Sequence, residues 1–262
     1  MHDGHTMYRS WFSPASVRSR RLLLLGITLV FFASKVAAVP TVVPLGSVGG
    51  AKPEPRDVAE RQVQALGFRY AGDFEATVAP GFPIRLRMYI DPDQHCAAGL
   101  MDMTSGPQKI SMLEFSTDFL PAGSITTSTS PYMAVLACAP EKMVARVPWK
   151  QTVDEVYALH RALCRIATEQ HFEAKTVHAD AVAENIREST RRDCEYQVRA
   201  GRYRKVAEGQ YKMTLWGTVI AVPISWFQTT YGALFWWFRI PDGYYLWKLR
   251  RRLRHLRGKQ PG

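Results

Sequence analysis

Cysteine is scarce in this chain, and the sequence motifs of several common enzyme classes are missing. Only four of the 262 residues are cysteine, and none of them forms a CxxC pair, which argues against a disulfide-rich scaffold. The sequence also lacks a G-x-S-x-G elbow, an S-x-x-K pair, a P-loop, an H-E-x-x-H helix and a dinucleotide-binding glycine fingerprint. These absences favour a non-enzymatic protein over an enzyme, and the sequence predicts no cofactor.

Acidic residues are fewer than basic ones, and the excess positive charge lies at the two ends of the chain. Asp and Glu number 23 against 34 Lys and Arg, a net charge of +11. Residues 1–21 carry +3 and residues 239–262 carry +7, which leaves +1 for residues 22–238. A nucleic-acid-binding domain usually spreads its basic residues over the folded surface, so nucleic acid is not the expected partner. Basic segments beside apolar stretches are instead typical of membrane proteins.

The first apolar stretch, residues 22–33, is too short to cross a bilayer comfortably. Its 12 residues lack any charge, but as a helix they would span about 18 Å against roughly 30 Å of hydrocarbon. Arginines precede the stretch and small residues follow it, so residues 1–38 are expected to be a secretory signal peptide that is cleaved after Ala38. The alternative is an uncleaved signal anchor that runs through Val43, with Lys35 extending toward water.

The second apolar stretch, residues 213–238, predicts a transmembrane helix. It contains 26 residues without a charge, between Lys212 and Arg239, which is long enough to cross a bilayer with some tilt. Tryptophan at both ends is typical of the membrane–water interface. The expected interfacial anchors are Trp216, Trp236 and Trp237.

Basic residues near the two apolar stretches predict the orientation of the chain. Eight Lys and Arg follow the second stretch and five precede it, which favours a cytoplasmic C-terminus. The N-terminal arginines also favour the cytoplasm, so the domain between the two stretches is expected on the exported side of the inner membrane. The bilayer and an unidentified envelope protein are the expected partners, and a homo-oligomer is compatible with the sequence.

The basic C-terminal tail, residues 239–262, shows a helical pattern. Leu246, Leu249, Leu253 and Leu256 recur at nearly helical spacing, which predicts an amphipathic helix that lies on anionic lipid. The alternative is a plain stop signal that retains the tail in the cytoplasm. The basic residues expected to contact lipid are Arg250, Arg251, Arg252, Arg254 and Arg257.

Residues 56–174 are expected to form an exported α+β domain with a small antiparallel sheet and packed helices. Residues 83–90 alternate apolar and polar side chains, which is the period of a half-buried strand. Pro121 and Gly123 suit the turn of a hairpin between residues 109–116 and 125–128. Further strands are predicted at residues 68–74, 97–103, 133–138 and 143–147.

Two helices are predicted within this domain. Residues 55–66 have apolar side chains at helical spacing, and Gly67 is placed to end that helix in the left-handed conformation. Residues 151–172 form the clearest helix, because Thr152 and Glu155 make a capping box at its start.

Two segments of different composition flank the domain. Residues 39–55 are rich in proline and glycine, which predicts an extended linker. Residues 175–212 mix acidic and basic side chains with few apolar ones, which predicts a solvated helical stalk that leads into the transmembrane helix.

The four cysteines all lie in the part of the chain predicted to be exported, where a disulfide is compatible with the compartment. A bridge between Cys96 and Cys138 would staple the sheet, and one between Cys164 and Cys194 would fix the stalk. Free buried thiols are the interpretation that we favour, and the sequence does not determine the pairing.

Two groups of residues could supply ligands to a metal. His160, Cys164 and His171 are predicted on one face of the helix over residues 151–172, although that face is also apolar and a packed core is the favoured interpretation. A second group follows a predicted strand as an Asp-x-Asp-x-His run, for which a solvated turn is favoured. Its members are Asp91, Asp93 and His95. We therefore assign no catalytic residue and no metal site from the sequence.

The leading functional hypothesis is a membrane-tethered exported domain that acts as a non-enzymatic envelope interaction or sensing module. One alternative is a membrane-bound hydrolase, or a thiol- or metal-dependent enzyme, that uses Cys164 with His160 or the acidic run after residue 90. Another alternative is an accessory subunit of a membrane complex.

Overall fold

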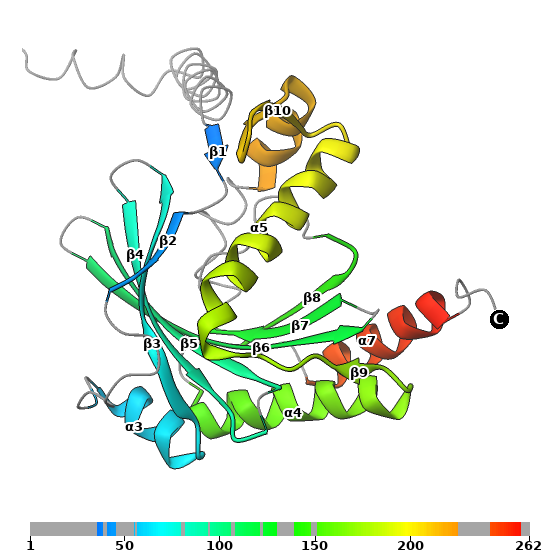
Figure 1. Ribbon diagram of the computed structural model, residues 1–262. Helices are drawn as coiled ribbons and strands as arrows, with labels where there is room; N and C mark the ends of the chain where they lie inside the picture. The colour runs from blue at the N-terminus through cyan, green and yellow to red at the C-terminus, as the bar shows by residue number, and fades with distance from the viewer. Residues whose placement is uncertain are drawn as a thin grey trace, which may run out of the picture.

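A computed structural model describes residues 36–38, 41–45, 55, 57–79, 82–93, 95–105, 108–120, 123–129, 139–147, 151–224 and 242–257. These residues form an α+β fold with one large sheet and one small sheet (Figure 1). The helices are α3 (Val58–Ala65), α4 (Val153–Glu169), α5 (Val182–Arg199) and α7 (Asp242–Arg257), with a short 3-10 turn η1 (Ala179–Ala181) before α5. A further helical segment covers residues 215–224.

The large sheet has the order β2-β3-β4-β5-β6-β7-β8, and β9 pairs with β6 outside that path. Its strands are β2 (Thr41–Pro44), β3 (Arg69–Ala79), β4 (Phe82–Ile90), β5 (Ala97–Ser105), β6 (Gln108–Leu120), β7 (Gly123–Ser128), β8 (Lys142–Arg146) and β9 (Glu173–Ala174). The pairings are antiparallel except that of β7 with β8, which is parallel. The predicted α+β class is therefore confirmed, but the sheet is mixed and larger than expected.

Local sequence features account for several of these elements. The capping box is present, because Thr152 Oγ1 accepts from the Glu155 amide at 3.3 Å and Glu155 Oε2 accepts from the Thr152 amide at 2.9 Å. Gly67 follows α3 with φ +89°, the left-handed conformation expected there. Gly123 has φ +91°, and a Cβ at this position would lie 1.9 Å from the Glu141 carbonyl oxygen. Only glycine therefore fits the turn between β6 and β7.

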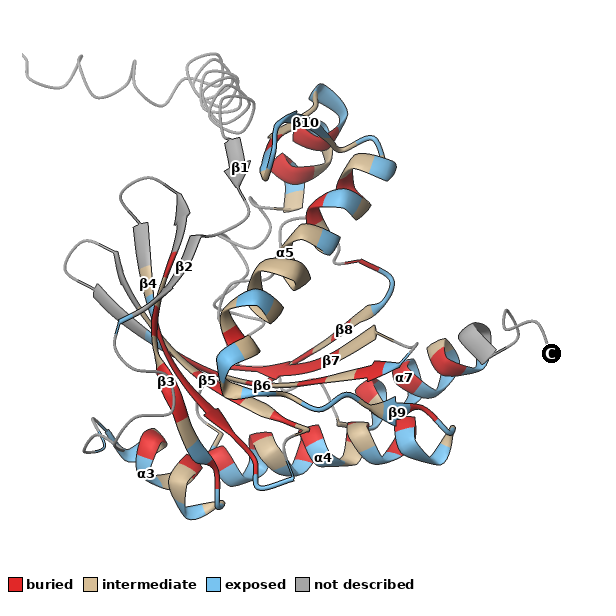
Figure 2. Ribbon diagram, in the orientation of Figure 1, coloured by how far each residue is buried: buried red, intermediate tan, exposed pale blue. Residues whose placement is uncertain are grey.

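Helices cover both faces of the large sheet. On one face α4 packs on β6 and β7, and α3 and α7 pack beside α4. The core of this face includes Phe115 and Leu163, both fully buried. On the other face α5 lies across the sheet, where it packs against β2 and against β10 (Tyr203–Ala207) of the small sheet (Figure 1). Figure 2 shows the buried residues concentrated along the central strands and on the sheet-facing sides of the helices.

Residues at the end of the predicted signal peptide and at the start of the predicted linker form strands in the structure. Residues 41–44 form β2, which pairs with β3 at the edge of the large sheet. Val36–Ala38 form β1, which pairs with β11 (Gln210–Met213) in the small sheet of order β1-β11-β10. Cleavage after Ala38 would remove a strand from this sheet. The first apolar stretch, residues 22–33, lies outside the described residues.

The prediction of a solvated stalk over residues 175–212 is wrong. Helix α5 ends at Arg199, and Gly201 turns the chain with φ +71°. The chain then forms a hairpin of β10 (Tyr203–Ala207) and β11 instead of continuing as a helix. The sheet-facing side of α5 also carries Val182, which is 2% exposed. The charged residues of α5 therefore indicate only which side of the helix faces solvent.

The predicted transmembrane helix over residues 213–238 is not supported. Met213 ends β11, residues 215–224 are helical, and residues 225–238, including Trp236 and Trp237, lie outside the described residues. Within the segment 215–224 Ala221 is fully buried and Val222 is 3% exposed, and Gly217 approaches the backbone of Arg202. Within the parts of the chain that the structure describes, none of the helices has the length and hydropathy needed to cross a bilayer.

The C-terminal tail is part of the folded domain. Helix α7 packs on α4, with Leu249 1% and Leu253 2% exposed in the same core as Leu163. The Tyr245 hydroxyl donates a hydrogen bond to the Arg146 carbonyl at 2.6 Å. The leucine stripe therefore faces α4 and not lipid. The sequence predicted that a membrane separates the tail from the domain. That prediction does not agree with the direct packing of α7 on α4.

Candidate functional site

His160 and Cys164 lie together in the core beneath the sheet, one turn apart on α4. The Cys164 Sγ atom is 3.4 Å from His160 Nε2. The imidazole is 1% exposed, and both of its nitrogens contact threonine hydroxyls: Nε2 lies 3.0 Å from Thr117 Oγ1 and Nδ1 lies 3.2 Å from Thr127 Oγ1. The imidazole is thus fully satisfied by neutral groups.

This pair has the opposite electrostatics to an activated thiol. Burial lowers the pKa of His160 to about 3, so the ring is neutral at physiological pH. Burial also raises the pKa of Cys164 to about 12, so the sulfur stays protonated. A nucleophilic cysteine needs a depressed pKa, which a charged imidazolium neighbour usually provides. The geometry therefore favours a packed core, which is the interpretation favoured from the sequence.

His171 does not join His160 and Cys164. Helix α4 ends at Glu169 with Gln170 as its C-cap, and His171 then adopts a φ of +63°. That left-handed residue reverses the chain into β9, and its side chain is exposed. The predicted helical face therefore loses its third member because the helix stops two residues earlier. No group of three or more metal-ligating side chains occurs among the residues that the structure describes.

Asp91, Asp93 and His95 form a turn after β4. The Asp91 side chain is buried, and its Oδ1 accepts hydrogen bonds from the His95 amide at 2.7 Å and the Cys96 amide at 2.9 Å. Asp93 is exposed. The first carboxylate is thus committed to holding the turn, because an Asp side chain readily bonds to backbone amides a few residues ahead. These hydrogen bonds of Asp91 are those of a structural turn.

The three described cysteines are free thiols, and two of them, Cys96 and Cys164, lie near each other in the core under the sheet, where both contact Thr117. Cys96 and Cys194 are buried and Cys164 is partly buried, and the Cys164–Cys194 bridge considered from the sequence is not formed. Burial raises the pKa of Cys194 to about 11 and raises that of Cys96 as well. Cys138 lies outside the described residues. None of these three thiols has the lowered pKa of a reactive cysteine.

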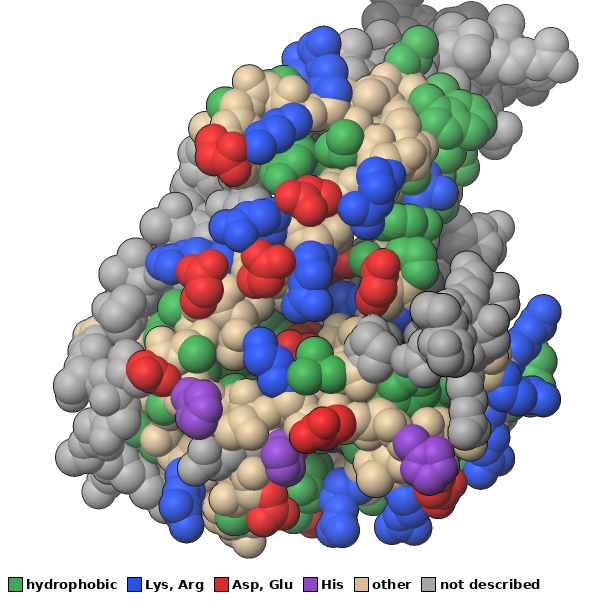
Figure 3. Space-filling view, turned by 45° about the vertical axis from the view of Figure 1, so that its right-hand side comes forward, with side chains coloured by type: hydrophobic (Ala, Val, Ile, Leu, Met, Phe, Trp, Pro, Cys, Tyr) green, Lys and Arg blue, Asp and Glu red, His purple; other side chains and the backbone are tan. Residues whose placement is uncertain are grey.

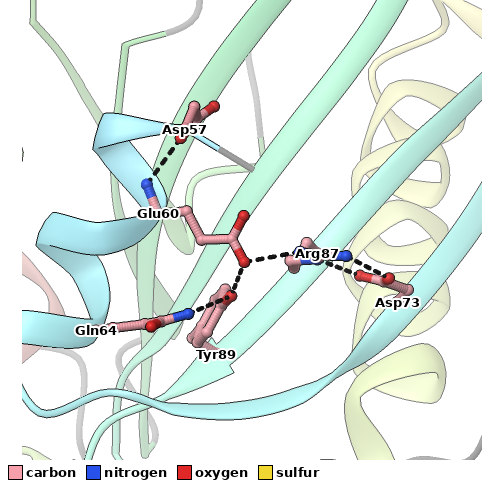
Figure 4. A network of polar contacts seen from close by, with 6 residues as sticks. All are labelled: Asp57, Glu60, Gln64, Asp73, Arg87 and Tyr89. Carbon is pink, nitrogen blue, oxygen red and sulfur yellow. Dashed lines mark hydrogen bonds and ion pairs between the residues drawn. The ribbon is translucent and has the colours of Figure 1, made fainter. Parts of the chain in front are cut away.

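A buried ionic network that the sequence did not reveal joins α3 to the sheet (Figure 4). Arg87 Nη1 lies 2.8 Å from Glu60 Oε1, while Arg87 Nε and Nη2 lie 2.7 and 2.8 Å from the two carboxylate oxygens of Asp73. The Tyr89 hydroxyl donates to the same Glu60 oxygen, and Gln64 donates to Tyr89 at 3.2 Å. The sequence carried no signal for the network, because the alternation over residues 83–90 places Arg87 at a regular polar position of the strand, where a solvated side chain is expected.

The network has a structural role at the mouth of a groove. Arg87 is 6% and Glu60 2% exposed. The bidentate Asp73 contact raises the pKa of Arg87 above its ordinary value despite the opposing effect of burial. Glu60 also lines a cavity of about 290 Å³ between α3, β5, β6 and the start of α4, a volume at the small end of ligand sites. Because its carboxylate binds Arg87 and Tyr89, we assign the network to fold stability.

The outer face of α7 is the most distinctive exposed surface. Tyr244 is 45% and Trp247 51% exposed. The Lys248 ammonium lies 6.0 Å from the Tyr244 ring centroid, and the Arg251 guanidinium lies 5.5 Å from the Trp247 ring centroid. Further exposed basic side chains on this helix are Arg250 and Arg254. Arg252 is half-buried, and the side chain of Arg257 is outside the described set. This face combines cations with amphipathic aromatics, the combination found at membrane interfaces.

A second apolar surface follows the small sheet. Leu215 is 77%, Trp216 59% and Val219 47% exposed on the helical segment 215–224. The antiparallel register places Val36 opposite Lys212, so the start of β1 lies beside the end of β11. Gly217 permits this segment to approach closely, because a Cβ there would lie 2.2 Å from the Arg202 carbonyl oxygen. Leu215 thus comes two residues after the end of β11, the strand that pairs with β1.

Comparison of the chain with protein-family models, with curated proteins and with solved structures gives no match.

Proposed function

We propose that this protein is a membrane-attached interaction module, not an enzyme, and that residues 22–33 hold it at the bilayer as an uncleaved anchor, whose short span of about 18 Å is matched by local thinning of the bilayer. The observation that carries the proposal is the pairing of β1 with β11. A signal peptide that is cleaved after Ala38 would leave with a strand of the fold, whereas an anchor that continues into β1 would be fixed to the domain.

The surface around this junction supports the attachment. Leu215, Trp216 and Val219 are exposed next to the strand that pairs with β1. An exposed apolar cluster of this kind is costly in water and marks an interaction site. An indole ring is also suited to the membrane–water interface, where its N–H stays hydrated.

The arginines before residue 22 favour retention of the N-terminus in the cytoplasm, which puts the domain on the exported side. Helix α7 then accompanies the domain, since it is packed on α4. Its basic residues do not oppose this orientation, because the bias of basic residues applies to short flanks of a span and folded domains translocate largely regardless of charge.

The non-enzymatic role is supported by the chemistry of the buried groups. His160 is neutral and Cys164 is protonated, so neither resembles an activated catalytic group. Asp91 is occupied by backbone amides. The polar side chains that sequence reasoning offered for catalysis thus act in the core and in a turn.

The test examines the native N-terminus and then the attachment itself. Mass spectrometry of the protein purified from membranes should find the residues before Val39 still present. Removal of residues 1–35, which leaves β1 intact, should release the protein from membranes washed with alkaline carbonate. The full chain with Trp216→Ser is the matched control and should stay in the membrane fraction. A native chain that starts at Val39, or a shortened chain that resists the wash, would contradict the proposal.

A further inference from the structure

We propose that the outer face of α7 is a docking surface for anionic lipid headgroups. The inference rests on the proposed membrane attachment and adds a second contact to it. The surface consists of Tyr244, Trp247, Lys248, Arg250, Arg251 and Arg254.

The first step of the argument is that α7 presents this face rigidly. The opposite side of the helix is anchored in the core by Tyr245, Leu249 and Leu253, which are 4%, 1% and 2% exposed. These residues recur at i, i+4 and i+8, so they form one buried stripe. The remaining positions must then face outward together. A basic segment that is anchored in this way loses little conformational entropy when it binds.

The second step is the charge of the outer face. Lys248, Arg250, Arg251 and Arg254 are exposed within about two turns of the helix, and the only acidic residue of α7 is Asp242 at its start. Helix α5 differs, because its exposed arginines pair with acidic neighbours: Arg191 with Glu188 at 2.6 Å and Arg187 with Glu184 at 3.2 Å. Figure 3 shows this mixture of red and blue side chains across the α5 face. An anionic surface complements α7 and not α5.

The third step distinguishes a lipid surface from a nucleic acid. Trp247 and Tyr244 stand beside Arg251 and Lys248, and half-exposed Trp and Tyr are the residues enriched at headgroup depth. Stacking on single-stranded bases needs open ring faces, and one face of each ring is already occupied by a basic side chain. Each Lys or Arg near an anionic membrane contributes about 1 kcal/mol, which corresponds to about a fivefold change in binding per residue.

The experiment uses the full chain in nanodiscs with a photoreactive phenylalanine analogue in place of Trp247. Discs of phosphatidylcholine alone are compared with discs that also contain about one third phosphatidylglycerol. After illumination, mass spectrometry should find lipid adducts several-fold more abundant on the anionic discs, and high salt should reduce them. The same analogue in place of Val58, which is 59% exposed on α3, is the positional control and should give few adducts.

Charge reversal provides the matched variants. Arg250→Glu, Arg251→Glu and Arg254→Glu together should reduce the adducts at position 247 by at least tenfold. The control reverses three exposed cations elsewhere, Arg61, Arg69 and Lys175, and should leave the adducts unchanged.

Each remaining outcome contradicts a specific part of the argument. Equal adduct yields on neutral and anionic discs would overturn the lipid surface. Adducts to added single-stranded RNA without a lipid preference would replace it with nucleic-acid binding. Failure of the chain to co-purify with discs of either composition would instead contradict the membrane attachment, so the two proposals fail in distinguishable ways.

Discussion

The two faces of the large sheet are covered by helices of different character. Three helices from distant parts of the chain, α3, α4 and α7, share one apolar core with side chains such as Phe115 and Leu163. The opposite face is covered by α5, which contributes Val182 to a smaller core around Phe74 and Leu86. The first face therefore carries most of the apolar burial.

The comparison of α5 with α7 shows what helical charge does and does not specify. Both sequences are rich in charge, and both helices pack on the domain through a narrow apolar side. The difference lies on their exposed sides, where α5 pairs acidic with basic residues and α7 presents mainly basic ones. Charge therefore does not determine whether a helix packs, but its sign pattern determines what the outer side can bind.

The largest loss of stability is expected from a change in the ionic network around Arg87. This network is the only buried one among the described residues on the face that α4 covers. Arg87→Met would remove the guanidinium that lies 2.8 Å from the carboxylate of Glu60, which is 2% exposed. A buried charge that loses its partner costs about 3–5 kcal/mol of unfolding free energy. Urea unfolding in detergent, followed by circular dichroism, measures the change. Arg87→Met combined with Glu60→Gln should recover part of the loss, and an equal loss in both variants would contradict a role for charge pairing.

The second prediction tests whether α7 packs on α4 and so contributes to the core on that face of the sheet. Leu249→Ala removes a side chain that is 1% exposed between α7 and α4, and truncation of a buried leucine costs about 2–5 kcal/mol. The exposed neighbour Arg250→Ala is the control and should change unfolding by less than about 0.5 kcal/mol. Equal and small effects of the two substitutions in the same urea titration would show that α7 is detached, as the sequence alone predicted.

Local patterns predicted most elements of the sheet face that carries α4. The alternation over residues 83–90, the capping box at Thr152 and the turn at Gly123 each specify local backbone geometry, and each is present. The parallel pairing of β7 with β8 was not predictable in this way, because strand direction depends on a connection and not on the strand itself.

Residues outside the predicted domain were misplaced for a common physical reason. The stripe of Leu249 and Leu253 indicates that one side of a helix avoids water, but lipid and a protein core satisfy that need equally well. The same ambiguity affected residues 215–224, where Trp216 is exposed and Val222 is buried.

For the candidate site, residue type suggested His160 with Cys164, and the two side chains do lie close together. The sequence does not reveal that both side chains lie in the core among neutral partners, which keep the imidazole neutral and the thiol protonated.

A smaller effect is expected when acid protonates the buried imidazole of this face. The pKa of His160 is lowered to about 3 in the fold, below about 6.5 in an unfolded chain. The unfolded state therefore binds the proton first, so stability is complete above about pH 6.5 and falls toward pH 3. Between pH 7 and pH 5 the loss from His160 should be about 2 kcal/mol. Unfolding at both pH values should show a correspondingly smaller difference for His160→Gln, and an unchanged difference would contradict a neutral buried ring.

The smallest effect is expected on the exposed side of α5. Arg191 and Glu188 lie 2.6 Å apart, but their side chains are 40% and 43% exposed, so solvent screens most of their attraction. Arg191→Gln should change the unfolding free energy by less than about 0.5 kcal/mol. Salt should reduce even this difference, which a urea titration repeated in high salt measures. A loss above about 1 kcal/mol would mean that ion pairs within α5 contribute substantially to its stability, and the two faces would then differ in the kind of interaction and not only in its extent.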